Sequence, residues 1–352
     1  DVGLIPMMLP DYQRVASEPA LARFDRYWGA TLARTPGLTV VEIIQAAEAG
    51  RIRGMYIMGE NPAMSDPDQA HARAALAGLE WLVVQEIVPT ETAVLADVIL
   101  PASAFPEKTG TFTNTDRMVQ LARAAVDPPG QARQDLWIIN QMARRLGLDW
   151  NADDARAVFA EMRGCMPSIA GITWERLHSE GSVTYPCRQE GDPGQPIEFV
   201  ERFPTASGRG RFVPSALSFA DERPDADYPM VLITGRQLEH WHTGAMTRRA
   251  TVLDAIEPVP TVALHPEALR RIGLAPGDTV RVVSRRGAIE LQARADEALA
   301  AGDVFIPFAY AEAAANLLTN PALDPFGKSP ELKYCAVRIE RAGEPSQLAT
   351  KQ

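Results

Sequence analysis

Residues 234–249 hold the densest set of side chains in this chain that could do chemistry. They read Thr-Gly-Arg-Gln-Leu-Glu-His-Trp-His-Thr-Gly-Ala-Met-Thr-Arg-Arg and follow an apolar run, 228–233, typical of a buried strand. Glycines let a backbone approach a ligand, threonines and amides donate hydrogen bonds, and arginines pair with phosphate. This mixture predicts a loop that wraps an anionic ligand. The alternative is a polar surface turn after a strand.

Two histidines of this loop, His240 and His242, are separated by one residue. On a strand or in an extended loop they would face the same side. Two imidazoles can begin a metal site, but no third ligand of a suitable type lies nearby in the sequence. We therefore expect no metal ligand here, and stacking or hydrogen bonding to a cofactor is the favoured role.

A second set of polar residues follows two short apolar runs. Residues 55–58 and 81–84 read as strands, and they lead into 59–61 and 85–86. A helix is predicted over 66–78 between them. Because strands alternate with helices, a parallel α/β sheet is expected, and ligands of such sheets lie beyond the carboxyl ends of the strands. The alternative is a pair of ordinary strand–helix turns. Further elements are predicted at 40–50 (helix), 90–96 (helical turn), 98–100 (strand) and 136–146 (helix).

Several charged or amide side chains near these strand ends could contact a nucleotide. Asn61 could donate to and accept from a base. Either Glu86 or Asp97 could recognise guanine, because one carboxylate accepts from both the ring N–H and the exocyclic amine. Nothing in the residues themselves chooses between the two acids, and each could equally cap a helix. Lys108 could meet a phosphate, and Asp135 is either a helix cap or a ligand.

The second half of the chain has a different pattern. Residues 280–284 and 288–293 alternate apolar and polar residues around Arg-Arg-Gly, which predicts a hairpin, and further strands are expected at 304–308 and 335–339. Short strands with few helices favour a small barrel. Before them, 151–225 is rich in glycine and proline and is interpreted as a connector.

Composition excludes some classes of partner. The 352 residues carry a net charge of −10, which argues against binding to nucleic acid or to an anionic membrane surface. No apolar stretch approaches a membrane span, and residues 1–10 lack the basic start of a secretory signal. The three cysteines lie far apart without a CxxC motif, which predicts reduced packing residues rather than disulfides or a cluster site.

The order of these motifs resembles the molybdenum or tungsten bis-(molybdopterin guanine dinucleotide) oxidoreductases. This family includes formate dehydrogenases, nitrate reductases and the dimethyl sulfoxide reductase group. The large subunit of cytoplasmic NAD-dependent formate dehydrogenases is the most similar group. The segments that carry the resemblance are 1–12, 58–64, 84–109, 111–117, 234–249 and 304–338.

The resemblance implies an α/β fold with a parallel-sheet dinucleotide-binding domain (1–150), the connector (151–225), a double-psi β-barrel domain (226–345) and a tail (346–352). It favours Glu86 over Asp97 as the reader of guanine. The cofactor contacts that it implies are Asn61, Gln85, Glu86, Lys108, Asp135, Thr234, Gly235, Arg236, Gln237, Leu238, Glu239, His240, Trp241, His242, Thr243, Phe308, Asn316 and Lys333.

One departure from the family pattern is as informative as the matches. The cysteine or selenocysteine that holds the metal, the arginine beside it and the iron–sulfur cysteines are expected upstream of residue 1, so no catalytic residue or metal ligand is assigned here. The chain is expected to be the C-terminal part of a formate dehydrogenase catalytic subunit, inactive alone. Iron–sulfur clusters, FMN and NAD would belong to the missing part and to partner subunits. A nitrate reductase subunit and a non-catalytic scaffold that binds the cofactor are the alternatives.

Overall fold

The computed structural model describes residues 5–150 and 154–343. Contacts divide the chain into two compact units, one formed by 1–39 and 100–216 and the other by 40–99 and 217–352. The boundaries predicted at 150 and 225 follow chain order instead, and they stay predictions. The predicted tail, 346–352, lies outside the described residues.

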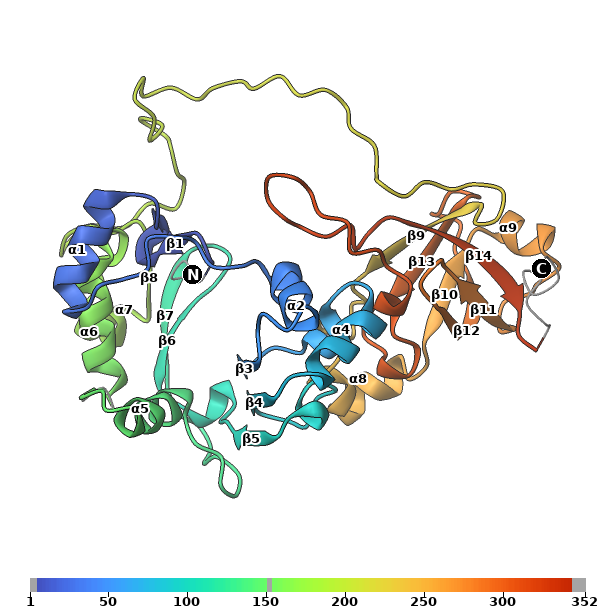
Figure 1. The fold of residues 1–352 in the computed structure, drawn as a ribbon. Coiled ribbons are helices and arrows are strands. Elements are labelled where there is room, and N and C mark those ends of the chain that lie inside the picture. Colours follow the sequence, from blue (N-terminus) through green and yellow to red (C-terminus); the bar gives the residue numbers. More distant parts are fainter. Residues whose placement is uncertain (1–4, 151–153, 344–352) are drawn as a thin grey trace. The chain divides into compact units, whose positions relative to one another are not determined.

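A small sheet lies in the second unit. Its strands are β3 (Gly54–Met58), β4 (Trp81–Glu86) and β5 (Val98–Pro101), and β3 and β4 are parallel. Helices α2 (Val40–Glu48) and α4 (Gln69–Ala77) lie on the same side of these strands (Figure 1). The helices pack on Ile57, Leu82 and Val84, which are buried. The predicted α/β architecture is therefore confirmed.

The helix predicted over 66–78 begins later than expected. A four-residue helix, α3 (Pro62–Ser65), follows β3 directly, and α4 starts only at Gln69. Asp68 between them has a φ of 45°, which no helix can accommodate. Pro67 also disfavours helical geometry at Asp66. The acids at 66 and 68 therefore shape a turn instead of forming the first turn of a helix.

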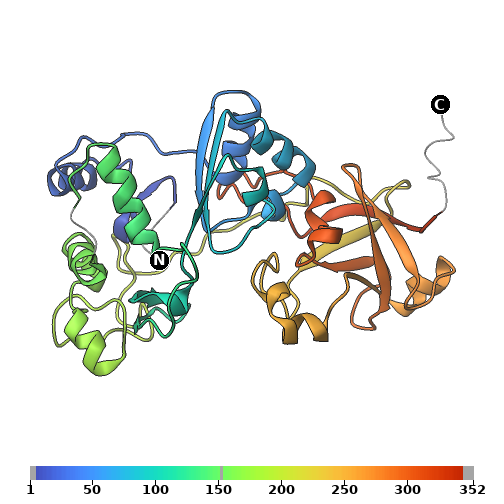
Figure 2. The ribbon, with the colours of Figure 1, turned by 90° about the horizontal axis from the view of Figure 1, so that it is seen from below.

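The barrel is closed. Its six strands run in the order β10-β12-β11-β14-β9-β13, with β9–β13 and β10–β12 parallel. The barrel is the yellow-to-red part of the ribbon in Figure 2. The alternating residues Val280 and Val282 point into a core that also contains Leu232 and Val304. The bounds are β9 (Met230–Gly235), β10 (Thr261–Leu264), β11 (Thr279–Val283), β12 (Ala288–Ala295), β13 (Asp303–Pro307) and β14 (Cys335–Arg341), with α8 (Thr251–Ile256) and α9 (Pro266–Arg271) between strands. Strand β10 was not predicted, because all four of its residues are buried and it shows no alternation.

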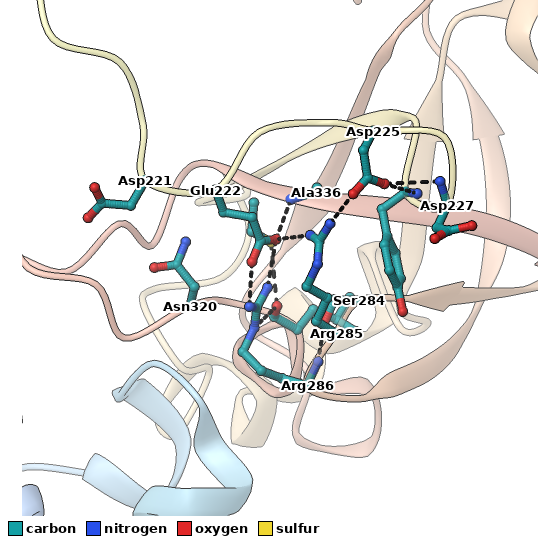
Figure 3. A network of polar contacts seen from close by, with 12 residues as sticks. Asp221, Glu222, Asp225, Asp227, Ser284, Arg285, Arg286, Asn320 and Ala336 are labelled. Atoms are coloured by element: carbon teal, nitrogen blue, oxygen red, sulfur yellow. Dashed lines mark hydrogen bonds and ion pairs between the residues drawn. The ribbon is translucent and has the colours of Figure 1, made fainter. Parts of the chain in front are cut away.

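Glu222 fastens the end of the predicted connector to the barrel (Figure 3). Its two carboxylate oxygens accept from the Arg286 guanidinium at 2.6 and 2.9 Å, and one also accepts from the Ala336 N–H at 2.7 Å. Burial opposes ionisation of Glu222, but these hydrogen bonds outweigh it and hold the pKa of the carboxyl below its usual value. Arg285 adds a third charged contact at 3.3 Å.

The other unit contains an antiparallel sheet of β6 (Gly110–Thr113), β7 (Met118–Ala122) and β8 (Ser182–Thr184). Strand β6 was not predicted, since threonines at alternating positions are compatible with a strand or with a polar loop. The helices of this unit are α1 (Glu18–Trp28), α5 (Asp135–Arg145), α6 (Ala155–Cys165) and α7 (Trp174–Glu180). The short antiparallel strands β1 (Met8–Leu9) and β2 (Gln13–Arg14) precede them. No helix in the described part of the chain is both long and apolar enough to cross a bilayer.

Candidate functional site

Close packing requires glycine at two positions of the loop after β9. A Cβ on Gly235 would come within 2.4 Å of the Phe305 ring, so any larger residue would have to displace that ring. Gly244 has a φ of 74°, and a Cβ there would lie 2.4 Å from the carbonyl oxygen of Ala309. The two glycines flagged by sequence therefore fix both ends of the segment that carries the polar side chains.

Three side chains cluster on the exposed surface of this loop. The Arg236 guanidinium donates to His242 Nε2 at 2.7 Å and lies 5.3 Å from the centroid of the Trp241 ring. Burial and the charge of Arg236 lower the pKa of His242, with Glu60 opposing them. His242 is therefore a neutral acceptor at pH 7, and the positive charge stays on Arg236. We name these three residues the loop tip; they present one cation and two aromatic faces to a ligand.

The two histidines do not face the same side, contrary to the expectation from their spacing. His242 is exposed, whereas only 1 % of His240 is exposed. The φ of His242 is 49°, a left-handed conformation that breaks the alternation of an extended strand. His240 therefore belongs to a layer beneath the loop tip.

This buried layer joins the loop to its surroundings through one backbone carbonyl. The carbonyl oxygen of Glu257 is 2.9 Å from His240 Nε2 and also accepts from the Tyr310 hydroxyl at 2.9 Å. Tyr310 donates more weakly to Gln237 Oε1 at 3.4 Å. The other ring nitrogen of His240, Nδ1, is buried without a protein partner among the described residues. Sequence reasoning did not select Glu257 or Tyr310, because their roles depend on contacts between distant segments.

The remaining predicted residues of the loop differ in exposure. Leu238 is 97 % exposed, Glu239 and Thr243 are half-buried, and the Thr234 hydroxyl donates to the Leu332 carbonyl at 2.6 Å. The Phe308 ring centroid lies 6.1 Å from that of His242. Phe308, the residue that follows β13, is therefore an aromatic neighbour of the loop tip.

At the sheet, the predicted residues are already engaged within the protein. Asn61 is buried; its Oδ1 accepts from the Thr92 N–H at 3.1 Å and the Thr92 hydroxyl at 2.8 Å, and its Nδ2 donates to Glu91 at 2.7 Å. Gln85 and Glu86 lie within β4 rather than after it, which corrects the predicted strand end. Gln85 is buried and accepts from the Tyr56 hydroxyl.

The two acids proposed for guanine recognition have different surroundings. Asp97 accepts from the Leu82 N–H at 2.7 Å and so ties the start of β5 to β4. Glu86 accepts from the N–H of its neighbour Ile87 at 2.7 Å and is half-buried. This contact of Asp97 joins two strands and does not cap a helix, so it differs from the helix-capping alternative.

Four further residues were predicted outside the loop and the sheet ends. Asn316 is buried and donates to the Ser65 carbonyl at 2.7 Å, which links the barrel to the turn after α3. Lys333 is exposed. Lys108 and Asp135 belong to the other compact unit, where they form an ion pair with each other. Whether any of these residues touches a cofactor stays a prediction.

The described residues contain no group of three or more His, Cys, Asp or Glu side chains that could hold a metal ion. All three cysteines are free and buried. Burial raises the pKa of Cys335 to about 12, so that thiol stays protonated.

In the comparison with known proteins, the sheet region and the barrel region each match a family model. The family model described as "Molybdopterin oxidoreductase" matches residues 12–145, and the one described as "Molydopterin dinucleotide binding domain" matches residues 230–336. The second range contains the whole loop tip and the barrel strands apart from most of β14.

Relatives and a solved structure agree with these models. An F420-dependent formate dehydrogenase subunit alpha of Methanocaldococcus jannaschii is 45% identical over 97% of this chain and 50% of its own length. An assimilatory nitrate reductase catalytic subunit of Bacillus subtilis is 34% identical over 94% and 48%. Acetylene hydratase from Pelobacter acetylenicus has the same fold, with a TM-score of 0.71, 18% identity and coverage of 92% of this chain and 49% of that one.

The chain thus spans about half the length of these curated relatives. Matches in both halves of the chain, in the order sheet then barrel, agree with the fold described above. The chain belongs to the molybdopterin oxidoreductase family.

Proposed function

We propose that this chain is the cofactor-binding portion of a formate dehydrogenase catalytic subunit, holding a bis-(molybdopterin guanine dinucleotide) cofactor with molybdenum or tungsten. The observation that carries the proposal is the loop tip, where Arg236, Trp241 and His242 are exposed together within the segment matched by the dinucleotide-binding model. One cation beside two aromatic faces suits a pterin with its pyrophosphate.

The residues present fit such a group. Arg236 would neutralise a phosphate, while Trp241 would give a face for stacking. His240, held by the Glu257 carbonyl, would fix the loop from below, and its unpartnered Nδ1 could accept a hydrogen bond. Asn61 and Glu86 would shape the nucleotide end of the site. When bound, the cofactor would supply a two-electron acceptor for the oxidation of formate to carbon dioxide and a proton.

Formate is favoured over nitrate by the relatives. The formate dehydrogenase subunit named above shares 45% identity with this chain, against 34% for the nitrate reductase subunit. Nitrate reduction is the second candidate, because that relative also matches nearly the whole chain. A scaffold that binds the cofactor without turnover is the third.

The electron acceptor is a finer part of the proposal. Iron–sulfur clusters and a flavin subunit with FMN would carry the electrons to NAD in the cytoplasm. The name of the 45%-identical relative makes coenzyme F420 the competing acceptor. Both acceptors would be reached through partner subunits and through the part of the catalytic subunit outside this chain.

The test is metal analysis and acid-released GMP on the protein from its native host, with the intact mass of the subunit recorded on the same sample. Molybdenum or tungsten with about two GMP per metal is expected. Formate-dependent and nitrate-dependent dye assays, followed by reduction of NAD or F420, then separate the candidates. A subunit that contains metal and GMP but does not oxidise formate would contradict formate as the substrate. A subunit without metal or GMP would contradict the proposed cofactor.

A further inference from the structure

A cavity of about 180 Å³ lies between helix α2, the turn that joins α3 to α4, and Pro321 of the segment between β13 and β14. All the residues that line it belong to one compact unit. Among them Gln45 and Glu48 of α2 are exposed, whereas only 5% of Asp66 is exposed. The cavity therefore connects solvent with a buried carboxyl group.

The charge of the cavity wall is one-sided. Three of the lining residues are the acids Glu48, Asp66 and Asp68, and no lysine or arginine belongs to the described residues that line the cavity. His71 is the one basic side chain there, and its Nδ1 lies 3.4 Å from a carboxylate oxygen of Glu48. The wall therefore favours a cation over an anion or a neutral guest.

Asp66 provides an independent indication that a partner belongs in the cavity. Its Oδ1 accepts a long hydrogen bond, 3.4 Å, from the Ser65 hydroxyl, and its Oδ2 is buried without a partner among the described residues. A buried carboxylate is costly unless it is paired, hydrogen-bonded or protonated. Burial raises the pKa of Asp66 to about 6, so about nine-tenths of these carboxyls are ionised at pH 7 and lack a counter-charge.

The fold holds this carboxyl in place without a ligand. On one side of it Asp68 has a φ of 45°, and its N–H donates to the Thr319 carbonyl at 3.2 Å. On the other side the Ser65 carbonyl accepts from Asn316 at 2.7 Å. A left-handed conformation at a residue other than glycine persists only where the surrounding structure imposes it. The position of Asp66 is therefore preformed.

Size and chemistry select the kind of cation. A water molecule takes about 30 Å³, and ligands of drug size need about 300 to 1,000 Å³, so the cavity suits a guest of roughly six heavy atoms or fewer. A metal ion is not favoured, because the described part of the chain has no group of three or more suitable side chains. Val41 and Ile44, each 5% exposed, and Pro321 add apolar wall for a short alkyl chain.

We propose that this cavity binds a small primary alkylammonium ion, with its NH₃⁺ group on Asp66 and its alkyl chain against Val41 and Ile44. An ammonium group has three hydrogen-bond donors and no acceptor, which matches carboxylates that have only acceptors to offer. The bound ion would join α2 to the turn before α4 and so stabilise this region. The site goes beyond the proposed function, since it needs neither the molybdopterin cofactor nor formate.

The test is isothermal titration calorimetry on the full-length subunit from its native host, dialysed into an amine-free buffer at pH 8. The probe is ethylammonium chloride, and saturable binding of one ion per subunit is expected. Tetramethylammonium chloride, which has no N–H donor, and sodium chloride at the same ionic strength should give no such isotherm. Equal binding of tetramethylammonium would overturn the proposal. The absence of saturable ethylammonium binding would do so too, including the case in which a lysine from elsewhere fills the cavity.

Variants locate the binding. Asp66→Asn should weaken ethylammonium binding at least about 10-fold, because the amide keeps the shape of the carboxylate but removes its charge. The matched control is Glu80→Gln, an exposed acid of the same unit that pairs with Arg53 at 2.6 Å and does not line the cavity. Its affinity should equal that of the wild type. Unchanged affinity in Asp66→Asn would place the ion elsewhere and contradict the proposed site.

The pH dependence of binding gives a readout that a purely structural Asp66 would not move. The other titratable groups around it are Glu48, Asp68, His71 and Glu60. The ammonium ion needs the ionised carboxylate, of which about a tenth remains one pH unit below the pKa, so affinity at pH 5 should be about 10-fold lower than at pH 8. The measurement is repeated in His71→Gln, which removes repulsion by a protonated imidazole. Equal affinity at both pH values in that variant would exclude Asp66 as the binding group.

Discussion

The barrel loop and the sheet ends were both predicted as ligand sites, yet their polar side chains differ in exposure and in hydrogen bonding. At the loop tip, Arg236 and Trp241 are exposed, and their side chains lie against each other and against His242. At the sheet, Asn61 and Gln85 are buried and hydrogen-bonded to neighbouring side chains. The difference teaches that polar residues near the end of a strand can be engaged within the protein, whereas those of the loop tip stay exposed.

The largest effect is expected from removing the charge of the loop tip. Arg236→Ala should lower cofactor retention by about 100-fold, since a charge-assisted hydrogen bond to phosphate contributes about 3 kcal/mol. The measurement is GMP and metal per subunit after gel filtration. The matched control is Arg271→Ala, an exposed arginine of the barrel unit that pairs with Glu267 on the same helix. Equal losses of GMP and metal in both variants would show that Arg236 contributes no more to cofactor retention than an exposed arginine elsewhere in the barrel unit.

Asn61→Ala should act through the fold instead. It leaves the Thr92 N–H and hydroxyl without their acceptor in a buried place, at a cost of about 2 kcal/mol. The thermal midpoint of the full-length subunit should fall, and cofactor loss should follow it in proportion. A variant with unchanged midpoint and lost GMP would instead make Asn61 a direct ligand contact and erase the contrast between the two regions.

The pH dependence of the unfolding free energy tests the role of Asp66 in the sheet region. Burial raises its pKa to about 6, with a hydrogen bond from Ser65 opposing the shift. A carboxyl with a raised native pKa favours the folded state most below its unfolded value near 4, and this contribution is lost as pH rises through 6. Asp66→Asn should therefore raise the unfolding free energy at pH 8 by about 1 to 2 kcal/mol. The stabilisation should be absent at pH 4, as denaturant titrations at both pH values would show; equal effects would exclude titration as the cause.

The smallest effect concerns His242. Its pKa is lowered by burial and by Arg236, so the folded state resists its protonation. Its contribution to stability is complete above the unfolded pKa near 6.5 and declines as the pH falls below that value. The thermal midpoint of the wild type should fall slightly more between pH 7 and pH 5 than that of His242→Gln. Identical pH profiles would show that the imidazole is not held neutral by Arg236.

Much of the fold followed from local pattern. The apolar runs predicted β3, β4, β9 and β13, because a buried strand needs consecutive or alternating apolar residues whatever surrounds it. Strand β10 and the β6–β7 hairpin were missed, since four buried residues without alternation, or threonines in a polar loop, do not identify a strand. Helix α4 began late because Asp68 adopts a left-handed conformation that only its neighbours impose.

For the site, the sequence by itself determined the loop after β9, since glycines with arginine and aromatic residues have few uses other than binding. Only the tertiary structure decided which of these residues are presented. His242 has a left-handed backbone conformation, whereas His240 lies inward and contacts the Glu257 carbonyl. Lys108 forms an ion pair with Asp135. The physical reason is that residue type sets what a side chain can bind, whereas burial and partners from distant segments set what it has left to offer.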